Sequence, residues 1–383
     1  MIECSCVEST ALTAVKSAGR QGRRIPSHGR AVLRFSLLAT FLVSCADSPV
    51  APVSDPAPEL GALFTRPTAA EKEAVIADWL ARDVSAQGYR EELSGAVTLG
   101  HGVGATLRVV SHTVTGARHF GAIIVPDGAA AGTLPVLVYA HGGDRGVSAG
   151  EAVILTTLLG NLAGSFVYVV PSFRSETLRV GSAAWTSEGE ASTWDYDVDD
   201  ALALLNLVIA HVPAADTTRL VALGQSRGGN VALLMSARDP RIDAVVEFFG
   251  PTDFFDSFVR EIIEEAAAGS VRDLPGVAML NQRYLQPFLS GAVTIDEMRH
   301  QLLLRSSAHF ADRLRAAQVH HGTADNVVAV SQAHSLIAEL EALGRGPPAF
   351  DFHIYSGGQH DPFTLPGSAE RTIAYLEPVV RPD

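Results

Sequence analysis

Residues 220–235 read LVALGQSRGGNVALLM, and the rest of the chain can be placed around this segment. The apolar run before Gly224 is typical of a buried strand, and the run after Gly229 has the apolar spacing of a helix. Ser226 is therefore predicted on a sharp turn between a strand and a helix, the context in which G-x-S-x-G forms a nucleophile elbow. We expect a Cβ at Gly224 or Gly228 to clash with neighbouring chain. The N–H groups that open the following helix would face negative charge developing at the serine.

Length and composition indicate a folded α/β protein. The chain has 383 residues, 47% of them hydrophobic, with 34 Gly and 20 Pro, which suits a compact fold with many turns rather than a disordered chain. The formal charge is −13, and residues 1–44 carry six Lys/Arg against two Asp/Glu, which leaves −17 for the remainder. Such an acidic surface repels nucleic acid and anionic head groups, so neither is an expected ligand. The sequence contains no dinucleotide fingerprint, P-loop or H-E-x-x-H motif, so we expect no cofactor and no metal.

The N-terminal segment has the layout of an export signal. Six basic residues between positions 16 and 34 precede an apolar stretch, 35–43, which is shorter than the about 20 residues that span a bilayer. It ends in Leu42-Val43-Ser44-Cys45, which resembles the lipobox of bacterial lipoproteins. That resemblance implies cleavage before Cys45 and acylation of this cysteine. A non-lipidated signal peptide or a buried N-terminal segment is the alternative.

This layout divides the chain into three parts. We expect a lipoprotein-type signal peptide over 1–44, a flexible Pro-, Ala- and Ser-rich tether over 45–66, and a folded domain over 67–383. The protein would then be exported and held at a bacterial cell-envelope membrane by the lipid on Cys45. The other two cysteines, Cys4 and Cys6, lie in the segment that would be removed. Neither an intrachain disulfide nor a cysteine metal site is then expected in the mature protein.

Strands and helices alternate through the domain. A helix is predicted over 68–83, and glycine-punctuated strands near 95–100, 106–114 and 118–126 suit an antiparallel sheet edge. Beyond them, continuous apolar strands alternate with helices, which predicts a mostly parallel, doubly wound sheet. The predicted strands are 134–140, 166–171, 220–223, 243–250, 317–322 and 350–355, and the predicted helices are 150–162, 195–211, 329–343 and 368–376.

Two segments are expected to lie over the ends of the strands. Residues 257–313 have helical periodicity broken by Gly and Pro and are predicted as a helical cap insertion. Residues 175–194 are predicted as a polar surface loop. Five phenylalanines could line an apolar acyl or aryl site or simply pack the cap, and two tryptophans could contact substrate or pack locally: Phe254, Phe255, Phe258, Phe288, Phe310, Trp185 and Trp194.

The strand 134–140 ends in His141-Gly142-Gly143. Upstream of G-x-S-x-G, this is the expected place for a second oxyanion donor, because backbone N–H groups at glycine can come close to the developing charge. Gly142 and Gly143 are therefore predicted to form the oxyanion hole with the backbone N–H of Arg227. His141 is predicted to be structural, with a catalytic histidine as the alternative. Residues 195–200, which include four aspartates, fit the first turn of a helix by dipole stabilisation, with a metal site as the alternative.

Two further loops, together with the features above, make the sequence similar to a known protein family. H-G-T-A-D-N-V-V follows the strand 317–322, and G-G-Q-H follows the strand 350–355. With the elbow and the His-Gly-Gly strand end, they make residues 95–380 resemble the α/β-hydrolase superfamily, in particular its esterase and prolyl-oligopeptidase-like group. The resemblance implies a triad in the order Ser226, Asp325, His360. His360 would act as general base and then acid, and Asp325 would orient its ring.

Other residues remain open at this point. Asp253 follows the preceding strand and is the rival for the acid of the triad. His320 and His321 are predicted to be structural, with contact to substrate as the alternative because they lie at a strand end. The remaining histidines of the domain's C-terminal half that could rival His360 are predicted to be structural: His309, His334 and His353.

The predicted function is hydrolysis of a small or medium carboxylic ester through an acyl-enzyme. A prolyl-oligopeptidase-like peptidase acting on short peptides is the first alternative, although the segment before residue 95 is too short for the propeller of those enzymes. Lactone hydrolysis or acyl transfer would use the same residues. A non-catalytic surface protein that keeps the fold for binding is the alternative from another class.

Overall fold

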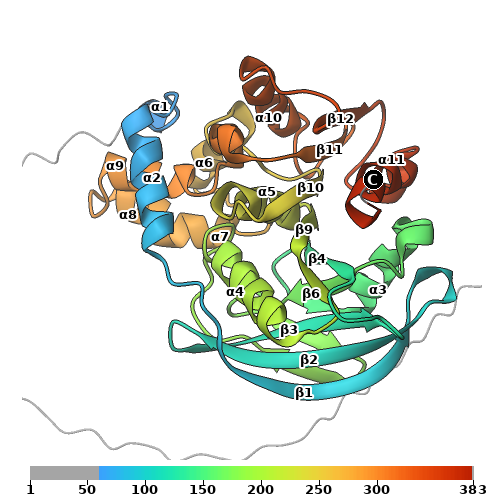
Figure 1. Ribbon diagram of the computed structural model, residues 1–383. Coiled ribbons are helices and arrows are strands. Elements are labelled where there is room, and N and C mark those ends of the chain that lie inside the picture. Colours follow the sequence, from blue (N-terminus) through green and yellow to red (C-terminus); the bar gives the residue numbers. More distant parts are fainter. Residues whose placement is uncertain (1–59, 382–383) are drawn as a thin grey trace, which may run out of the picture. The chain divides into compact units, whose positions relative to one another are not determined.

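The computed structural model describes residues 60–381, and a nine-stranded sheet runs through them (Figure 1). The signal peptide, Cys45 and the tether as far as residue 59 lie outside the described residues. The order of the strands across the sheet is β1-β2-β3-β6-β4-β9-β10-β11-β12. Their bounds are β1 Gln87–Thr98, β2 Gly104–Val114, β3 Ala117–Pro126, β6 Val167–Pro171, β4 Leu134–Ala140, β9 Ala215–Gln225, β10 Ile242–Phe248, β11 Ala317–Gly322 and β12 Phe350–Tyr355.

The sheet has an antiparallel and a parallel part, as predicted. Strands β1, β2, β3 and β6 pair antiparallel in that order, whereas β6, β4, β9, β10, β11 and β12 pair parallel. The first strand is longer than predicted, because β1 begins at Gln87 and pairs with β2 along nearly its whole length. All parallel strands end at one edge of the sheet, and that edge carries the site described below.

Helices cover both faces of the sheet, which is why its central strands are continuously apolar. On one face the core is formed with α4 (Tyr196–His211), α5 (Arg227–Arg238) and α10 (Ser331–Ala342). On the other face it is formed with α3 (Ala149–Leu158) and α11 (Ser368–Val380). Successive residues of β9 belong to different faces, since Leu220 and Ala222 lie in the first core and Val221 and Leu223 in the second.

The predicted cap is a group of short helices that follows β10. Its elements are α6 (Ser257–Ala267), α7 (Val277–Leu280), a π-helical turn η3 (Asn281–Leu285), α8 (Gln286–Leu289), α9 (Ile295–Leu303) and the 3₁₀ segment η4 (Ser307–Arg313). Asp256 begins α6 by accepting hydrogen bonds from the N–H groups of Phe258 and Val259. The apolar residues of α6 that are buried, Val259, Ile262, Ile263 and Ala266, lie on the side that faces the site.

The N-terminal helices lie against this cap (Figure 1). Helix α2 (Ala69–Ala81) begins with a capping box in which Thr68 and Glu71 satisfy each other's backbone N–H groups. Arg299 of α9 binds the Glu71 carboxylate at 2.6 Å and the carbonyls at the end of α1 (Leu60–Leu63). This arginine therefore ties α1 and α2 to the outer side of the cap.

The segment 175–194 is not simply a surface loop. It contains an antiparallel hairpin of β7 (Thr177–Val180) and β8 (Ala183–Thr186), and β7 also pairs with β5 (Val147–Ser148) in a small separate sheet. The strand period is hard to see in this Gly- and Ser-rich sequence, because each strand is four residues long. Trp185 lies in this hairpin, opposite Leu178.

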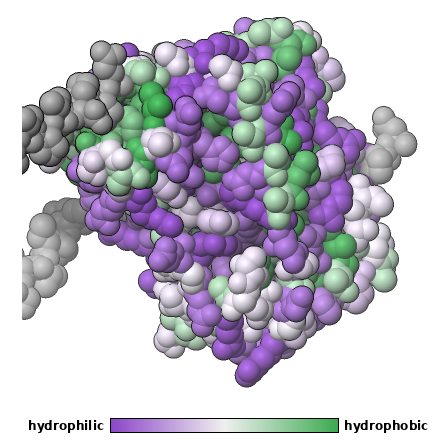
Figure 2. All heavy atoms as spheres, turned by 90° about the vertical axis from the view of Figure 1, so that its left-hand side faces the viewer, coloured by the Kyte–Doolittle hydropathy of each residue, from purple (hydrophilic) through white to green (hydrophobic). Residues whose placement is uncertain are grey.

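The face that carries α1, α2, α8 and α9 is mainly hydrophilic, and its hydrophobic residues form separate small groups (Figure 2). Single exposed apolar residues such as Leu80 are ordinary on a water-facing surface. None of the helices within residues 60–381 combines the length and the apolar character needed to cross a bilayer.

Candidate active site

Ser226 lies in a strained turn between β9 and α5. Its φ of +56° and ψ of −127° are rare for a residue with a side chain, and its N–H donates to the Phe248 carbonyl at 2.8 Å. A Cβ at Gly224 would overlap the backbone of Gly228, and a Cβ at Gly228 would overlap the carbonyl of Ala140. Both glycines are therefore required by close approach of backbone, as the sequence predicted.

The start of α5 and the end of β4 both reach Ser226. Ser226 is the N-cap of the twelve-residue helix α5, so the first N–H groups of the helix, beginning with Arg227, have no partner one turn earlier. Gly142 lies so close that a Cβ there would be 3.3 Å from Ser226 Cβ. Gly142 and Gly143 line one open cleft together with Ser226. The structure thus brings the three predicted oxyanion-hole residues around the serine.

His141 is fully buried beneath the loop that carries Gly142 and Gly143, and it contacts the backbone of this loop. Its Nδ1 lies 2.9 Å from the Gly142 carbonyl, and its ring stacks on Phe173 at 4.4 Å between centroids. The Gly142 carbonyl and the Gly143 N–H belong to one planar trans peptide and point in opposite directions. The contact with His141 therefore turns the Gly143 N–H away from the histidine. Burial lowers the pKa of His141 to about 4, so the ring is neutral near pH 7.

Asp325 and His360 form a close pair beyond the ends of β11 and β12. His360 Nδ1 lies 2.7 Å from Asp325 Oδ2, and Asp325 Oδ1 accepts from the N–H groups of Val327 and Val328 at 2.8 and 2.9 Å. Burial opposes ionisation of Asp325, but the hydrogen bonds from His360 and the backbone outweigh it and lower the pKa of this carboxyl. Asp325 is thus an ionised partner that fixes one side of the His360 ring.

The other side of this ring belongs to the same cleft as Ser226. His360 and Ser226 both line it, and the His360 ring packs on Phe249 with 4.3 Å between centroids. Within residues 60–381 no hydrogen bond joins the Ser226 hydroxyl to His360. In enzymes that use this pairing the bond often forms only with substrate bound.

The rival residues are engaged elsewhere. The Asp253 carboxylate contacts His309 at 3.1 Å, Ser335 and the Phe255 N–H, so it is a partner of the cap and not of His360. His320 is buried between Tyr355 and Gln318.

His321 is also buried and bonds the Val328 carbonyl at 2.9 Å. Both rings are thus structural, as predicted, and the alternative of a contact with substrate is wrong because both are sealed in the core. His321 instead lies 3.5 Å from Asp325 Oδ2 and is a neighbour of the pair.

The four aspartates of residues 195–200 form buried ion pairs, a role beyond the predicted stabilisation of the helix dipole. All four aspartates are buried, and each binds a different arginine: Asp195 with Arg82, Asp197 with Arg227, Asp199 with Arg238 and Asp200 with Arg174. The metal alternative finds no support, since residues 60–381 contain no group of three or more His, Cys, Asp or Glu side chains placed to hold an ion.

The Arg227 side chain is the functional feature that sequence reasoning missed. It is 1% exposed, binds both oxygens of Asp197 at 2.7 Å, and donates to the Gly143 carbonyl at 2.8 Å and to Glu176. Glu176 also accepts from the Gly146 N–H at 3.1 Å. Burial raises the pKa of Glu176 to about 7, although Arg227 opposes this. The network ties the elbow to both ends of the glycine loop, and its members lie too far apart in sequence for any local signal to reveal it.

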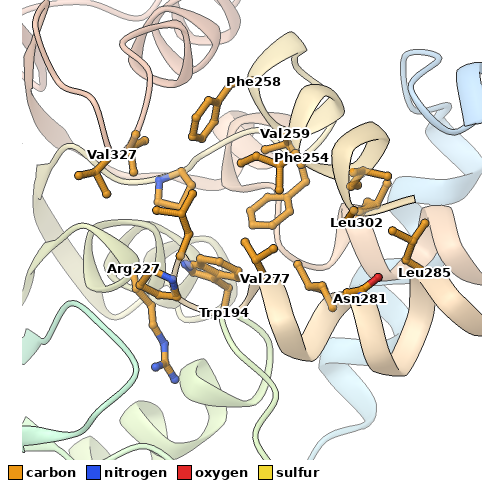
Figure 3. Close-up of a pocket in the computed structure, with 18 of the residues that line it drawn as sticks. Trp194, Arg227, Phe254, Phe258, Val259, Val277, Asn281, Leu285, Leu302 and Val327 are labelled. Carbon is orange, nitrogen blue, oxygen red and sulfur yellow. The ribbon is translucent and has the colours of Figure 1, made fainter. Parts of the chain in front are cut away.

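An apolar pocket opens from Ser226 under the cap (Figure 3). Its volume is about 730 Å³ when the part open to solvent is included, and its walls come from α6, α7, α9 and the residues around Trp194. Of the aromatic residues considered from the sequence, Phe254, Phe258 and Trp194 line it. The other predicted candidates lie outside its lining, and Phe310, for example, packs on Trp79 with 4.5 Å between ring centroids.

Comparisons with known proteins identify the fold. No protein-family model matches the sequence, and no curated protein is similar to it in sequence. Acetyl xylan esterase 1 from Thermoanaerobacterium sp. JW/SL YS485 is similar in structure, with a TM-score of 0.56 and 18% identity over 84% of this chain and 98% of that one. The acetyl xylan esterase from Paenibacillus sp. R4 gives a TM-score of 0.53 and 18% identity over 86% and 99% of the two chains. Together with the sheet order and the elbow, these matches show that the described residues have the α/β-hydrolase fold predicted from the sequence.

Proposed function

We propose that the protein is a serine hydrolase that cleaves carboxylic esters through an acyl-enzyme intermediate. One observation carries the proposal: the strained Ser226 shares a cleft with Gly142 and with His360, whose other nitrogen is bound by an ionised Asp325 at 2.7 Å. A nucleophile, a base, an oriented acid and backbone donors are the parts that acyl transfer requires.

The proposed steps follow from this geometry. The Ser226 hydroxyl attacks the ester carbonyl while His360 takes its proton, and Asp325 stabilises the imidazolium. The N–H groups of Arg227 and of Gly142 or Gly143 stabilise the oxyanion of the tetrahedral intermediate. His360 then protonates the departing alcohol, and a water activated by the same histidine releases the acid.

The two cavities at Ser226 would hold different parts of the substrate, one the leaving group and the other the acyl chain. The leaving group must lie beside the proton donor, and His360 lines the open cleft but not the apolar pocket. The acyl chain would therefore enter the apolar pocket, whose size suits a chain longer than acetyl. Each buried methylene is worth about 0.8 kcal/mol, which corresponds to roughly fourfold in kcat/KM.

Ester hydrolysis has more support than peptide hydrolysis. The two solved structures named above are both esterases, and their chains are covered almost completely by this one. Short peptides remain the alternative substrate of the same site, and a binding protein without activity is the alternative from another class.

The test is labelling of the purified protein with a fluorophosphonate, beside Ser226→Ala and the exposed-serine control Ser270→Ala. We expect labelling that is lost only in Ser226→Ala. p-Nitrophenyl esters of increasing chain length and peptide p-nitroanilides then distinguish ester from amide cleavage. Absence of labelling at every pH tested between ~6 and ~9, where a serine nucleophile with a histidine base is expected to react, would contradict the proposal and favour the binding protein.

We also propose that the protein is exported and lipid-anchored through Cys45. Support comes from the basic and apolar segments before this residue and from the lipobox-like Leu42-Val43-Ser44-Cys45. Expression of the full-length gene in a bacterium with radiolabelled palmitate should label the processed chain, which begins at Cys45, in the membrane fraction. Cys45→Ser should lose the label, whereas Cys6→Ser should keep it; equal labelling of both variants would exclude this site.

A further inference from the structure

Glu151 is a carboxylate of the open cleft that has no cationic partner. It lines this cleft together with Ser226, His360 and Gly142. No Arg, Lys or His within residues 60–381 forms an ion pair with it. Carboxylates that are withdrawn from water are usually paired with a cationic side chain. The acidic groups behind the elbow follow that rule, since Asp197 and Glu176 share Arg227.

Glu151 does not make the capping hydrogen bond that is usual for a glutamate at its position in α3. Ser148 is the N-cap, and Glu151 occupies the third helical position, where a glutamate commonly completes a capping box. In α2 and α9 the glutamate at this position does so, with Glu71 and Glu297 accepting from the N-cap N–H. Glu151 leaves that bond unmade and accepts instead from the Tyr139 hydroxyl at 2.8 Å.

A chain of hydrogen bonds fixes this orientation from the elbow. Gln225 Nε2 donates to the Tyr139 oxygen at 2.8 Å, and the single Tyr139 proton is donated to Glu151 Oε1. Gln225 immediately precedes Ser226, so the carboxylate is held relative to the nucleophile. A carboxylate has about four acceptor sites, and Tyr139, with Gln225 beside it, occupies at most two of them. The remaining capacity is available to a ligand in the cleft.

Glu151 lies on the side of the leaving group. This assignment rests on the proposed function, in which the departing alcohol lies beside His360, a residue of the same cleft. The other buried carboxylate near the elbow without a cation, Glu247, is 1% exposed and lies beneath Gly229, where no substrate reaches it. Glu151 is thus the carboxylate that a substrate can meet.

We propose that Glu151 is a specificity-determining residue that binds a positively charged, ammonium-type group on the alcohol part of the ester. A cation there would supply the missing charge partner. Burial raises the pKa of Glu151, which is the cost of holding a carboxylate in this place without a cation. The preferred substrate then combines an apolar acyl chain with a cationic leaving group.

The test compares two esters of the same shape. Butyrylcholine and 3,3-dimethylbutyl butyrate differ by a charged nitrogen in place of a carbon. We expect the wild-type kcat/KM to favour the cationic ester by roughly tenfold, mainly through KM, as for one partly buried ion pair without a hydrogen bond. Glu151→Gln keeps an acceptor for Tyr139 and should bring the ratio to within about threefold, with the neutral ester little affected. Glu341→Gln, an exposed glutamate of α10, is the matched control.

Each outcome has one meaning. A wild-type ratio near one, or a ratio that Glu151→Gln leaves unchanged, overturns the proposal while hydrolysis of the neutral ester upholds the proposed function. Hydrolysis of neither ester, with no fluorophosphonate labelling, overturns both. If Glu151→Gln does not fold, Glu151→Asp, which withdraws the charge by one methylene, should lower the ratio severalfold, and an unchanged ratio again overturns the assignment.

Discussion

The two cavities that meet at Ser226 are built from different parts of the fold. The apolar pocket is enclosed by the cap helices, whose residues come from one stretch of sequence after β10. The open cleft is lined mainly by residues at the ends of β4, β9, β10 and β12 and by the start of α3, with Val327 after β11 and Pro275 of the cap also lining it. The cap can therefore change its size and shape without disturbing the chemical groups, because these lie on the sheet.

The largest effect on kcat is expected at Asp325, because the reaction depends on this residue whichever cavity holds each part of the substrate. Asp325→Asn should lower kcat by about 10⁴-fold, because an asparagine no longer holds the productive His360 tautomer. The ratio of rates on long and short acyl chains should stay the same. Asp253→Asn serves as the rival-acid control and should keep kcat within a few-fold in the folded protein. A larger loss in Asp253→Asn than in Asp325→Asn would transfer the acid to residue 253.

The wall of the open cleft depends on a buried ion network. Arg227→Ala leaves Asp197 and Glu176 without their cation and should destabilise the protein by about 3–5 kcal/mol in urea unfolding. It should also lower kcat equally for all chain lengths, because the Gly143 carbonyl loses its donor. Arg381→Ala, which breaks an exposed pair with Glu377, should cost less than about 1 kcal/mol. Equal costs for the two variants would show that the buried network stabilises nothing.

Beneath the elbow, Glu247 should make stability depend on pH. Burial raises the pKa of this carboxyl to about 8, with the Gly250 N–H opposing and Asp325 adding to the effect. The unfolded state releases this proton near pH 4.5 and the folded state only near pH 8, so stability falls as pH rises between these values.

From pH 6 to 8 the wild type should therefore lose roughly 2 kcal/mol relative to Glu247→Gln, since the dependence flattens as the pH approaches the pKa of the folded state. Urea unfolding at both pH values, with Glu341→Gln as control, measures this difference. Parallel pH dependences of the wild type and Glu247→Gln would show that the carboxyl is not held protonated.

The smallest predicted effect concerns the apolar pocket alone. Val277 of α7 is buried in its wall, and Val277→Trp should fill part of the space (Figure 3). The preference for hexanoyl over butyryl p-nitrophenyl esters, roughly fifteenfold for two methylenes in the wild type, should then disappear. The rate on the acetyl ester should change less than threefold. An unchanged chain-length profile would place the acyl chain elsewhere.

The sheet and the residues at its strand ends could be predicted because the information is local. The central parallel strands are continuous apolar runs, whereas β11 and β12 also carry polar residues. Gly142, Ser226, Asp325 and His360 each follow a parallel strand closely. Since parallel strands end at the same edge, residues distant in sequence can be assigned to one site.

The supporting contacts could not be predicted, because they depend on side chains that meet only in the folded chain. The partners of Arg227 lie 30 and 51 residues away in sequence. The aspartates of residues 195–200 looked like a helix start, and nothing local indicates four separate arginines. Glu151 has the sequence position of a capping residue, and only its contact with Tyr139 reveals another role.

The strained backbone at Ser226 determines what a side chain at this position costs the folded protein. A residue with a side chain at φ +56° and ψ −127° costs of order 1–3 kcal/mol, whereas glycine adopts such angles freely. Ser and Gly codons can differ by one base. The substitution Ser226→Gly would remove this strain, although it would also raise the conformational entropy of the unfolded chain. The serine at this position is thus a backbone cost that the fold alone does not require.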